Sequence, residues 1–231
     1  MSVLFSSVNI SGPDSYKFLQ GQITANLDDL NNPSSQPILS AYCNLKGRVI
    51  SVFYIAKQSE NNYDFLFLGD TEDIFVKKIK KYSVFSKIQF SEPEFITDYL
   101  PENFKNLNLD LNYLIQHKIP IVTSESSELF LPDNINLIEL NAVSFKKGCF
   151  LGQEIIARVY YKGKTKQKLY LIKSDHNFNC VPGESILLNN ADKTIAGQIV
   201  YTDKNIGYAV IEDRFLDQEL VVGGDGIGVE R

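Results

Sequence analysis

The first third of the chain combines the hydrophobic periods of strands and of helices. Runs rich in β-branched and aromatic residues predict strands at Ile38 to Tyr42, Val49 to Ala56 and Tyr63 to Leu68. Apolar residues recur at helical spacing between Asp73 and Tyr82, which predicts a helix. Its apolar side would comprise Ile74, Phe75, Ile79 and Tyr82. This mixture of elements predicts an α+β fold.

The first residues predict a strand followed by a short helix. Val3 to Ile10 is a mixed apolar run. Ser11, Pro13 and Asp14 then suit a helix start, as a capping serine, an early proline and an acid in the first turn. We expect Gly21 to end this helix early. Four polar side chains would then lie close to a loop: Gln20, Gln22, Thr24 and Asn26.

The pattern changes twice further along the chain. Between Ser91 and Ile119 it blurs, with two prolines, which indicates a domain boundary or a shortened subdomain. From Lys168 onward, short apolar runs separated by turn residues predict a small antiparallel barrel. These runs are Leu169 to Ile172, Ser185 to Leu188, Ile195 to Tyr201 and Ile206 to Ile211. Residues 222–229 are glycine-rich but follow no strand-to-helix context, so they predict a last strand with a loose turn.

Composition narrows the class of protein. The 231 residues, 44% of them hydrophobic, suffice for one large domain or two small ones. We expect a cytoplasmic protein without membrane contact, because no leader pattern or run of about 20 apolar residues is present. Cys43, Cys149 and Cys180 are widely separated, which supports neither a disulfide framework nor a self-contained zinc or iron–sulfur site.

Reactive and backbone-shaping residues crowd into one short segment around Cys149. Gly148 and Gly152 bracket this cysteine, which predicts a shaped turn that exposes the thiol. Lys146 and Lys147 precede it. A short helix is predicted to follow, so the cysteine would lie just before a helix N-terminus, in surroundings that favour the thiolate. The alternative is a buried cysteine in a tight turn.

The predicted helix after the cysteine spans Gln153 to Arg158. Glu154 and Arg158 stand four residues apart, so their side chains can pair along one helix face. Ile155, Ile156 and Val159 supply its apolar side.

Charge is distributed unevenly along the chain. The net charge of −5 argues against a protein that coats nucleic acid over its whole surface. Lys146 to Lys168 nevertheless holds seven basic residues and one acidic residue. Its alternating lysines predict one side of an extended segment: Lys162, Lys164, Lys166 and Lys168.

Two interpretations of this basic segment stay open. It is either a solvated strand face or a site for a multiply charged anion. A folate glutamate tail, a nucleotide phosphate or an RNA backbone would fit, and Tyr160 and Tyr161 could stack on a ring.

Three short motifs agree with one known family. Residues 147–154 read Lys-Gly-Cys-Phe-Leu-Gly-Gln-Glu, like the signature Lys-Gly-Cys-Tyr/Phe-x-Gly-Gln-Glu. Residues 12–14 with 18–24 resemble an amino-terminal folate-domain motif, and residues 43–48 resemble a Cys-x-x-Lys-Gly-Arg/Lys element. Together they resemble the YgfZ-type proteins, relatives of the glycine-cleavage T protein.

The resemblance implies a fold and a function. The fold would be a ferredoxin-like folate-binding domain over residues 1–165, followed by a β-barrel over residues 166–231. Its first α+β unit would span about 1–92. The second, about 93–165, would be trimmed, because the chain is short for the family between Lys87 and Ile119. The function would be tetrahydrofolate binding in support of iron–sulfur cluster assembly or repair, including in enzymes that modify tRNA.

The same resemblance suggests site residues. Cys149 would be the functional thiol, and iron–sulfur proteins or cluster-assembly factors would be partners. Phe5 would offer a flat surface in a chain without tryptophan, and Gln20, Gln22 and Asn26 would bond the pterin. Lys46, Arg48 and Arg158 would hold the glutamate tail. Lys147, Gln153 and Glu154 complete the cofactor-binding set from the signature. Each could equally be a capping or surface residue.

Whether the chain is an enzyme stays open at the sequence level. No catalytic carboxylate is identifiable, because Asp14 suits a cap and Glu154 suits a partner for Arg158. The alternatives are a folate-dependent one-carbon transferase and an RNA-binding module that contacts tRNA through Lys146 to Lys168.

Overall fold

The computed structural model describes residues 5–32, 35–97, 100–163 and 165–230. Val3 and Lys164, which contributed to the sequence predictions, lie outside these ranges. No helix among the described residues is both long enough and apolar enough to cross a membrane.

The amino-terminal body is built on one six-stranded antiparallel sheet. Its strand order is β2-β3-β4-β1-β5, and β6 pairs with β1 as well. The bounds are β1 Phe5–Ser11, β2 Ile38–Cys43, β3 Val49–Ser59, β4 Asn62–Leu68, β5 Gln89–Phe90 and β6 Glu94–Ile96. The three strands expected from β-branched and aromatic runs are confirmed as β2, β3 and β4. They read as nearly continuous apolar runs because both sheet faces are covered.

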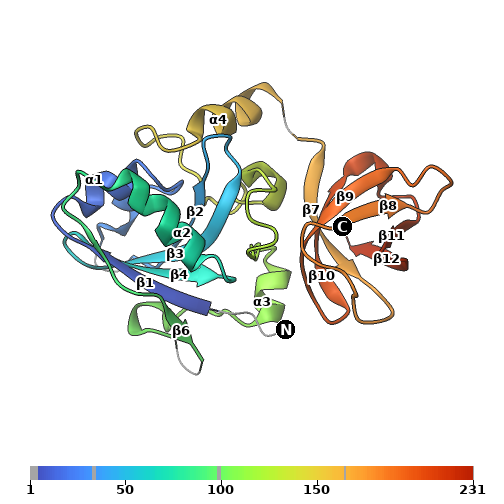
Figure 1. Ribbon diagram of the computed structural model, residues 1–231, viewed down its shortest axis with the longest axis horizontal. Coiled ribbons are helices and arrows are strands. Elements are labelled where there is room, and N and C mark those ends of the chain that lie inside the picture. Colours follow the sequence, from blue (N-terminus) through green and yellow to red (C-terminus); the bar gives the residue numbers. More distant parts are fainter. Residues whose placement is uncertain (1–4, 33–34, 98–99, 164, 231) are drawn as a thin grey trace.

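Two helices cover one face of the sheet (Figure 1): α1 spans Ser15–Gln20 and α2 spans Glu72–Ile79. Phe75 of α2 lies 5.3 Å from Phe53 and 5.1 Å from Phe67, ring centroid to centroid. Two predictions here were wrong. Ser11 ends β1 instead of capping a helix, because Asp14 directly precedes α1. Tyr82 leaves the apolar side, because α2 tightens into the 3₁₀ turn η2, Lys80–Tyr82, where its ring is 47% exposed.

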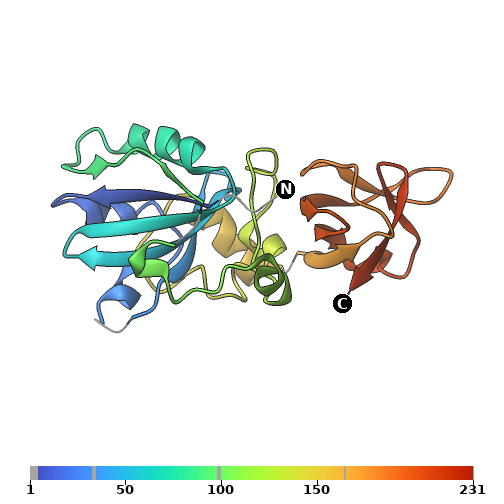
Figure 2. The same cartoon turned by 90° about the horizontal axis from the view of Figure 1, so that it is seen from below.

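The opposite face packs on a segment of short helices that separates the sheet from the barrel. These are η3 Glu102–Phe104, α3 Leu111–Gln116 and η4 Pro132–Ile135. Phe104 and Leu114 are fully buried in a core that includes Leu66 of the sheet and Tyr208 of the barrel. Figures 1 and 2 show α3 in this intermediate position. Among the described residues, the segment after β5 contributes only β6 to a sheet before the barrel begins.

The last third of the described chain forms a closed antiparallel barrel, as predicted. Its strand order is β10-β7-β12-β11-β8-β9. The bounds are β7 Gln167–Lys173, β8 Ser185–Leu188, β9 Ile195–Asp203, β10 Ile206–Glu212, β11 Leu220–Val222 and β12 Asp225–Glu230. The glycine-rich end is a hairpin, with Gly223 and Gly224 at φ 60° and 93° between β11 and β12. Glycine is needed there because the turn requires positive φ.

Helix α4, Gln153–Lys162, lies above the β2–β3 hairpin and leads to the barrel (Figure 1). The prediction of one extended lysine row was therefore wrong. Lys162 ends this helix, whereas Lys168 lies in β7, with its Nζ 3.9 Å from Asp213 Oδ2.

Candidate functional site

The cysteine loop, residues 145–152, presents Cys149 to solvent. The predicted exposure is confirmed, and the buried alternative is excluded. The predicted helix start at Gln153 is confirmed, with Gly152 as the cap, and the helix continues past Arg158 to Lys162. Cys149 therefore lies on the loop before the helix, four residues ahead of its first residue.

Gly152 shapes the end of this loop. Its φ is +80°, and a Cβ there would lie 2.5 Å from the carbonyl oxygen of Asn44. Gly47, at φ +72°, faces α4 in turn, because a Cβ on it would lie 3.1 Å from Ile156 Cγ1. The turn at residues 44–48 thus packs directly on the start of α4. A Cβ on Gly148 would have no neighbour within 4 Å, so the shaping role predicted for this glycine was wrong.

Lys147 anchors the loop to the amino-terminal motif. Its Nζ donates to the carbonyl oxygens of Ile23 and Ala25, each at 2.6 Å. The same amine lies 5.2 Å from the ring centroid of Phe150. Burial lowers the pKa of Lys147 to about 7. These contacts hold the Lys147 side chain toward the protein interior. The sequence had suggested that it would lie beside the Cys149 thiol.

Backbone bonds complete the junction. Leu151 N donates to Gly21 O at 3.1 Å, and Ser144 N donates to Thr24 O at 2.9 Å. The buried hydroxyl of Thr24 donates to Ala142 O at 2.7 Å and accepts from Ala41 N at 2.9 Å. The three motifs recognised in the sequence therefore meet at one place, around the cysteine loop.

The candidate side-chain amides near this junction differ in whether their polar atoms already have hydrogen-bond partners. Gln20 Nε2 donates to Asn26 Oδ1, and Gln20 Oε1 accepts from Leu27 N at 3.0 Å. Asn26 also caps the 3₁₀ turn η1, Leu27–Leu30, by accepting from Asp28 N at 3.2 Å. Both amides thus serve local structure. Gln22 differs, because its Oε1 is buried without a hydrogen-bond partner in the described part of the chain.

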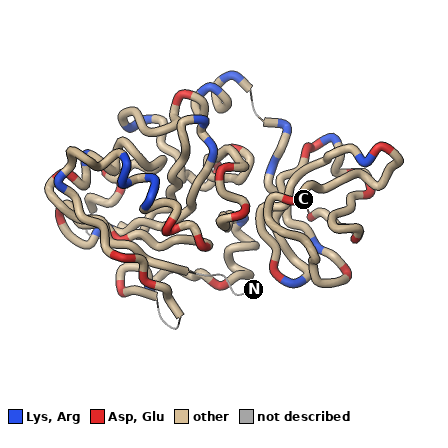
Figure 3. Tube along the Cα trace, viewed as in Figure 1, with Lys and Arg blue, Asp and Glu red and all other residues tan. Residues whose placement is uncertain are grey.

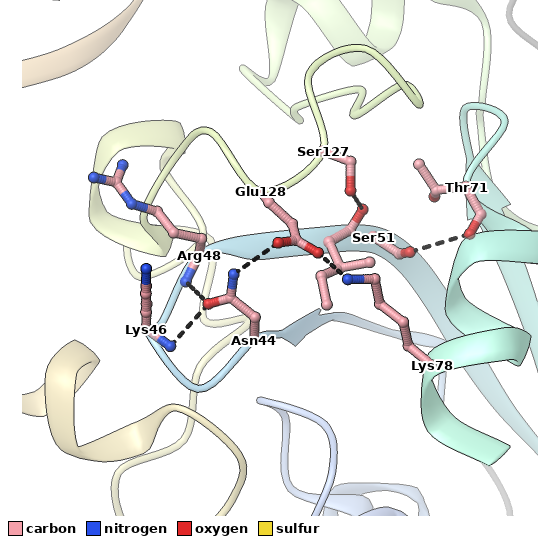
Figure 4. A network of polar contacts seen from close by, with 9 residues as sticks. Asn44, Lys46, Arg48, Ser51, Thr71, Lys78, Ser127 and Glu128 are labelled. Carbon is pink, nitrogen blue, oxygen red and sulfur yellow. Dashed lines mark hydrogen bonds and ion pairs between the residues drawn. The ribbon is translucent and has the colours of Figure 1, made fainter. Parts of the chain in front are cut away.

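A polar network holds the turn at residues 44–48 (Figure 4). Asn44 Oδ1 accepts from the backbone N–H groups of Lys46, at 2.9 Å, and Arg48, at 3.0 Å. Asn44 Nδ2 donates to Glu128 at 3.1 Å. Lys78 reaches from α2 to pair with Glu128 and lowers the pKa of that carboxyl. Sequence reasoning missed Lys78 and Glu128, because α2 and an irregular segment meet only in the fold.

The remaining candidates are scattered. Arg48 donates to Leu129 O, and Phe5 is half-buried against the core between sheet and barrel. Gln153 is half-buried at the start of α4. Glu154 and Arg158 are exposed, and within the described ranges they form no ion pair with each other, so the predicted helix pair was wrong.

The aromatic residues at the end of α4 pack among themselves. Phe145 and Tyr160 stack at 4.7 Å with 14° between their planes, and Tyr161 lies 5.6 Å from Phe145. No group of three histidine, cysteine or acidic side chains in the described residues could hold a metal ion.

Comparisons with known proteins agree with this arrangement. The tRNA-modifying protein YgfZ of Buchnera aphidicola is 29% identical, over 80% of this chain and 76% of that protein. YgfZ of Yersinia enterocolitica is 28% identical, over 78% and 72%. Aminomethyltransferase T of the glycine cleavage system of Bartonella henselae matches in structure with a TM-score of 0.66. That likeness covers 98% of this chain and 83% of the other, at 11% identity.

No family model matches the chain. The sequence relatives and the shared fold agree, however, with the three motifs that meet at the cysteine loop. The chain is therefore a relative of the YgfZ proteins, with the fold of the glycine-cleavage aminomethyltransferases.

Proposed function

We propose that this chain is a tetrahydrofolate-binding accessory protein that supports iron–sulfur enzymes of tRNA modification, with Cys149 as its functional thiol. One observation carries the proposal: three motifs distant in sequence are bonded together, and their junction presents an exposed cysteine. A structural cysteine would be buried at such a junction. The relatives are named as tRNA-modifying proteins, and this supports the link to tRNA modification in the proposal.

One buried atom beside the junction fits a folate ring. Gln22 Oε1 lacks a partner in the described residues, although unpaired buried oxygens are costly. Its neighbours Gly21 and Ile23 both bond the cysteine loop. The N–H groups of a pterin would satisfy this oxygen, and the exposed cations Lys46 and Arg158 would suit the carboxylates of the tail.

An anaerobic calorimetric titration with tetrahydrofolate tests the ligand. We expect saturable binding to the wild-type chain and weaker binding to Gln22→Leu, which lacks the amide. Gln116→Leu is the matched control, because Gln116 is exposed at the end of α3. Absence of wild-type binding would overturn the folate assignment, and equal binding by Gln22→Leu would remove Gln22 from it.

A second experiment tests the thiol separately. Cells that lack the chain would be complemented with Cys149→Ser, and tRNA nucleosides made by iron–sulfur enzymes would be measured by mass spectrometry. We expect Cys149→Ser to fail while still binding tetrahydrofolate. Cys180→Ser is the control, because Cys180 lies in the barrel portion and is partly buried. Full complementation by Cys149→Ser would refute the role of the thiol and leave the folate result unaffected.

A further inference from the structure

A pocket of about 310 Å³ opens between the turn at residues 44–48 and the end of α2. Lys46 and Leu45 line it from the turn, Lys81 and Tyr82 line it from η2, and Leu151 lines it from the cysteine loop. The pocket therefore adjoins the loop that presents Cys149, and of its lining residues the proposed folate function uses only Lys46.

The charges around the pocket leave two cations available. Lys78 forms an ion pair with Glu128, so the charges of this lysine and this carboxylate cancel. Lys46 and Lys81 are exposed and form no ion pair within the described part of the chain. Figure 3 shows basic positions gathered along α2 and the turn that follows it. The rim is thus positive in a protein whose net charge is −5.

Aromatic side chains supply the rest of the lining. Tyr82 is 47% exposed, so its ring can take a stacking partner. Tyr42 is 1% exposed, yet it also lines the pocket. Burial raises the pKa of Tyr42, so its hydroxyl stays protonated at neutral pH and keeps a proton to donate. The lining thus offers one ring for stacking and one hydroxyl for an acceptor on a bound ring.

We propose that this pocket binds one nucleotide unit, with its phosphate on Lys46 and Lys81 and its base against Tyr82. Single-stranded nucleic acid is recognised by this combination of ammonium groups and exposed aromatic rings. A volume of about 310 Å³ is at the lower end for ligand pockets, which suits a single ring and its phosphate. The favoured source is an RNA strand, because the rim is open and further lysines follow along α2.

Binding of a fluorescent octauridylate, followed by anisotropy at several salt concentrations, tests the site. We expect the double variant Lys46→Ala/Lys81→Ala to bind at least tenfold more weakly. Its salt slope should fall by about 0.7, because the one phosphate that both lysines hold contributes roughly 0.7 on a single strand. Tyr82→Ala should lose roughly tenfold through lost stacking, whereas Tyr82→Phe should bind like wild type.

Matched controls separate the pocket from general charge. Lys17→Ala/Lys193→Ala removes two exposed lysines outside the pocket and away from α2, and should change affinity less than twofold. Lys162→Ala/Lys166→Ala tests the basic residues at the end of α4 and just before β7. The proposal is overturned if Lys46→Ala/Lys81→Ala binds like wild type, or if only the Lys162 and Lys166 variant loses affinity.

Titration with uridine monophosphate distinguishes the two sources of a nucleotide. Binding of the octauridylate alone supports an RNA strand. Saturable binding of the mononucleotide, lost in Lys46→Ala/Lys81→Ala, supports the same pocket as a site for a free nucleotide. Absence of binding by both probes overturns the proposal, whatever the titration with tetrahydrofolate gives.

Discussion

Gly152 and Gly47 lie in direct backbone contact, since a Cβ on Gly152 would stand 3.1 Å from the Cα of Gly47. Both have positive φ, at +80° and +72°. One belongs to the cysteine loop and the other to the β2–β3 turn. This contact brings the two motifs together and leaves no room for a side chain between them.

Gly152→Ala should destabilise the chain by about 2–4 kcal/mol for two reasons. The new Cβ would clash with Asn44 O, and alanine is strained at the positive φ of this position. Gly148→Ala, in the same loop, should stay within about 0.5 kcal/mol, because its methyl meets open space. Urea unfolding of the two variants measures the difference. Equal stabilities would show that the contact is dispensable.

Lys147→Met should loosen the cysteine loop. It leaves the carbonyls of Ile23 and Ala25 without their donor, at a cost of about 1–3 kcal/mol at pH 7. Between pH 7 and 10 the unfolded wild-type chain binds more protons than the folded one, because burial lowers the pKa of Lys147 from 10.5 to about 7. The wild-type free energy of unfolding should therefore rise with pH relative to the variant.

Urea unfolding at pH 7 and 9.5 measures both effects, and Lys146→Met is the control, because Lys146 is exposed. A stability difference from wild type that stays constant with pH would contradict the titration of Lys147.

Thr24→Val should destabilise the junction by about 2–3 kcal/mol. The substitution keeps the shape of a fully buried side chain but removes the bonds to Ala142 O and Ala41 N. Thr24→Ser retains the hydroxyl and should therefore lose less stability than Thr24→Val. Thermal unfolding of both variants checks the order, and a Val variant as stable as the Ser variant would rule out the hydroxyl as the reason for threonine there.

Glu72→Gln should stabilise the chain at neutral pH. Glu72 is 3% exposed, its Oε2 has no partner in the described residues, and burial raises its pKa above 4.5. The folded chain therefore holds this proton longer than the unfolded chain, so stability is lost as pH rises through the folded-state pKa. The variant does not lose this stability, so its free energy of unfolding relative to wild type should increase from pH 4 to pH 7. Urea unfolding at both pH values measures it, and Glu94→Gln, at an exposed site, should show no such trend.

The three cysteines of the native chain should be alkylated in the order of their solvent exposure. Cys149 is exposed, Cys180 is partly buried, and Cys43 is fully buried, where burial also raises the pKa of its thiol. Iodoacetamide followed by peptide mass spectrometry should find Cys149 modified first and Cys43 only after unfolding. Early modification of Cys43 would contradict the packing of β2.

Much of the secondary structure follows from local patterns. The strands β2, β3 and β4 and the barrel strands β7 to β10 have apolar and β-branched runs between turn residues, and those runs suffice to predict them. Tyr82 shows the limit of this reasoning. Its helical spacing matched Ile79, but α2 ended and η2 turned the ring outward. Where a helix tightens depends on what packs against it.

The sequence by itself determined which elements form and which motifs mark the chain, because periodicity and turn chemistry are local properties. Only the tertiary structure decided that Lys147 faces inward, that Gln20 and Asn26 serve a 3₁₀ turn, and that Gln22 Oε1 has no partner among the described residues. The pocket beside Tyr82 also appeared only there. The orientation of Lys147 and the pocket depend on groups that are far apart in sequence and meet only in the folded chain. The bonds of Gln20 and Asn26 depend on a 3₁₀ turn that no hydrophobic period in the sequence marks.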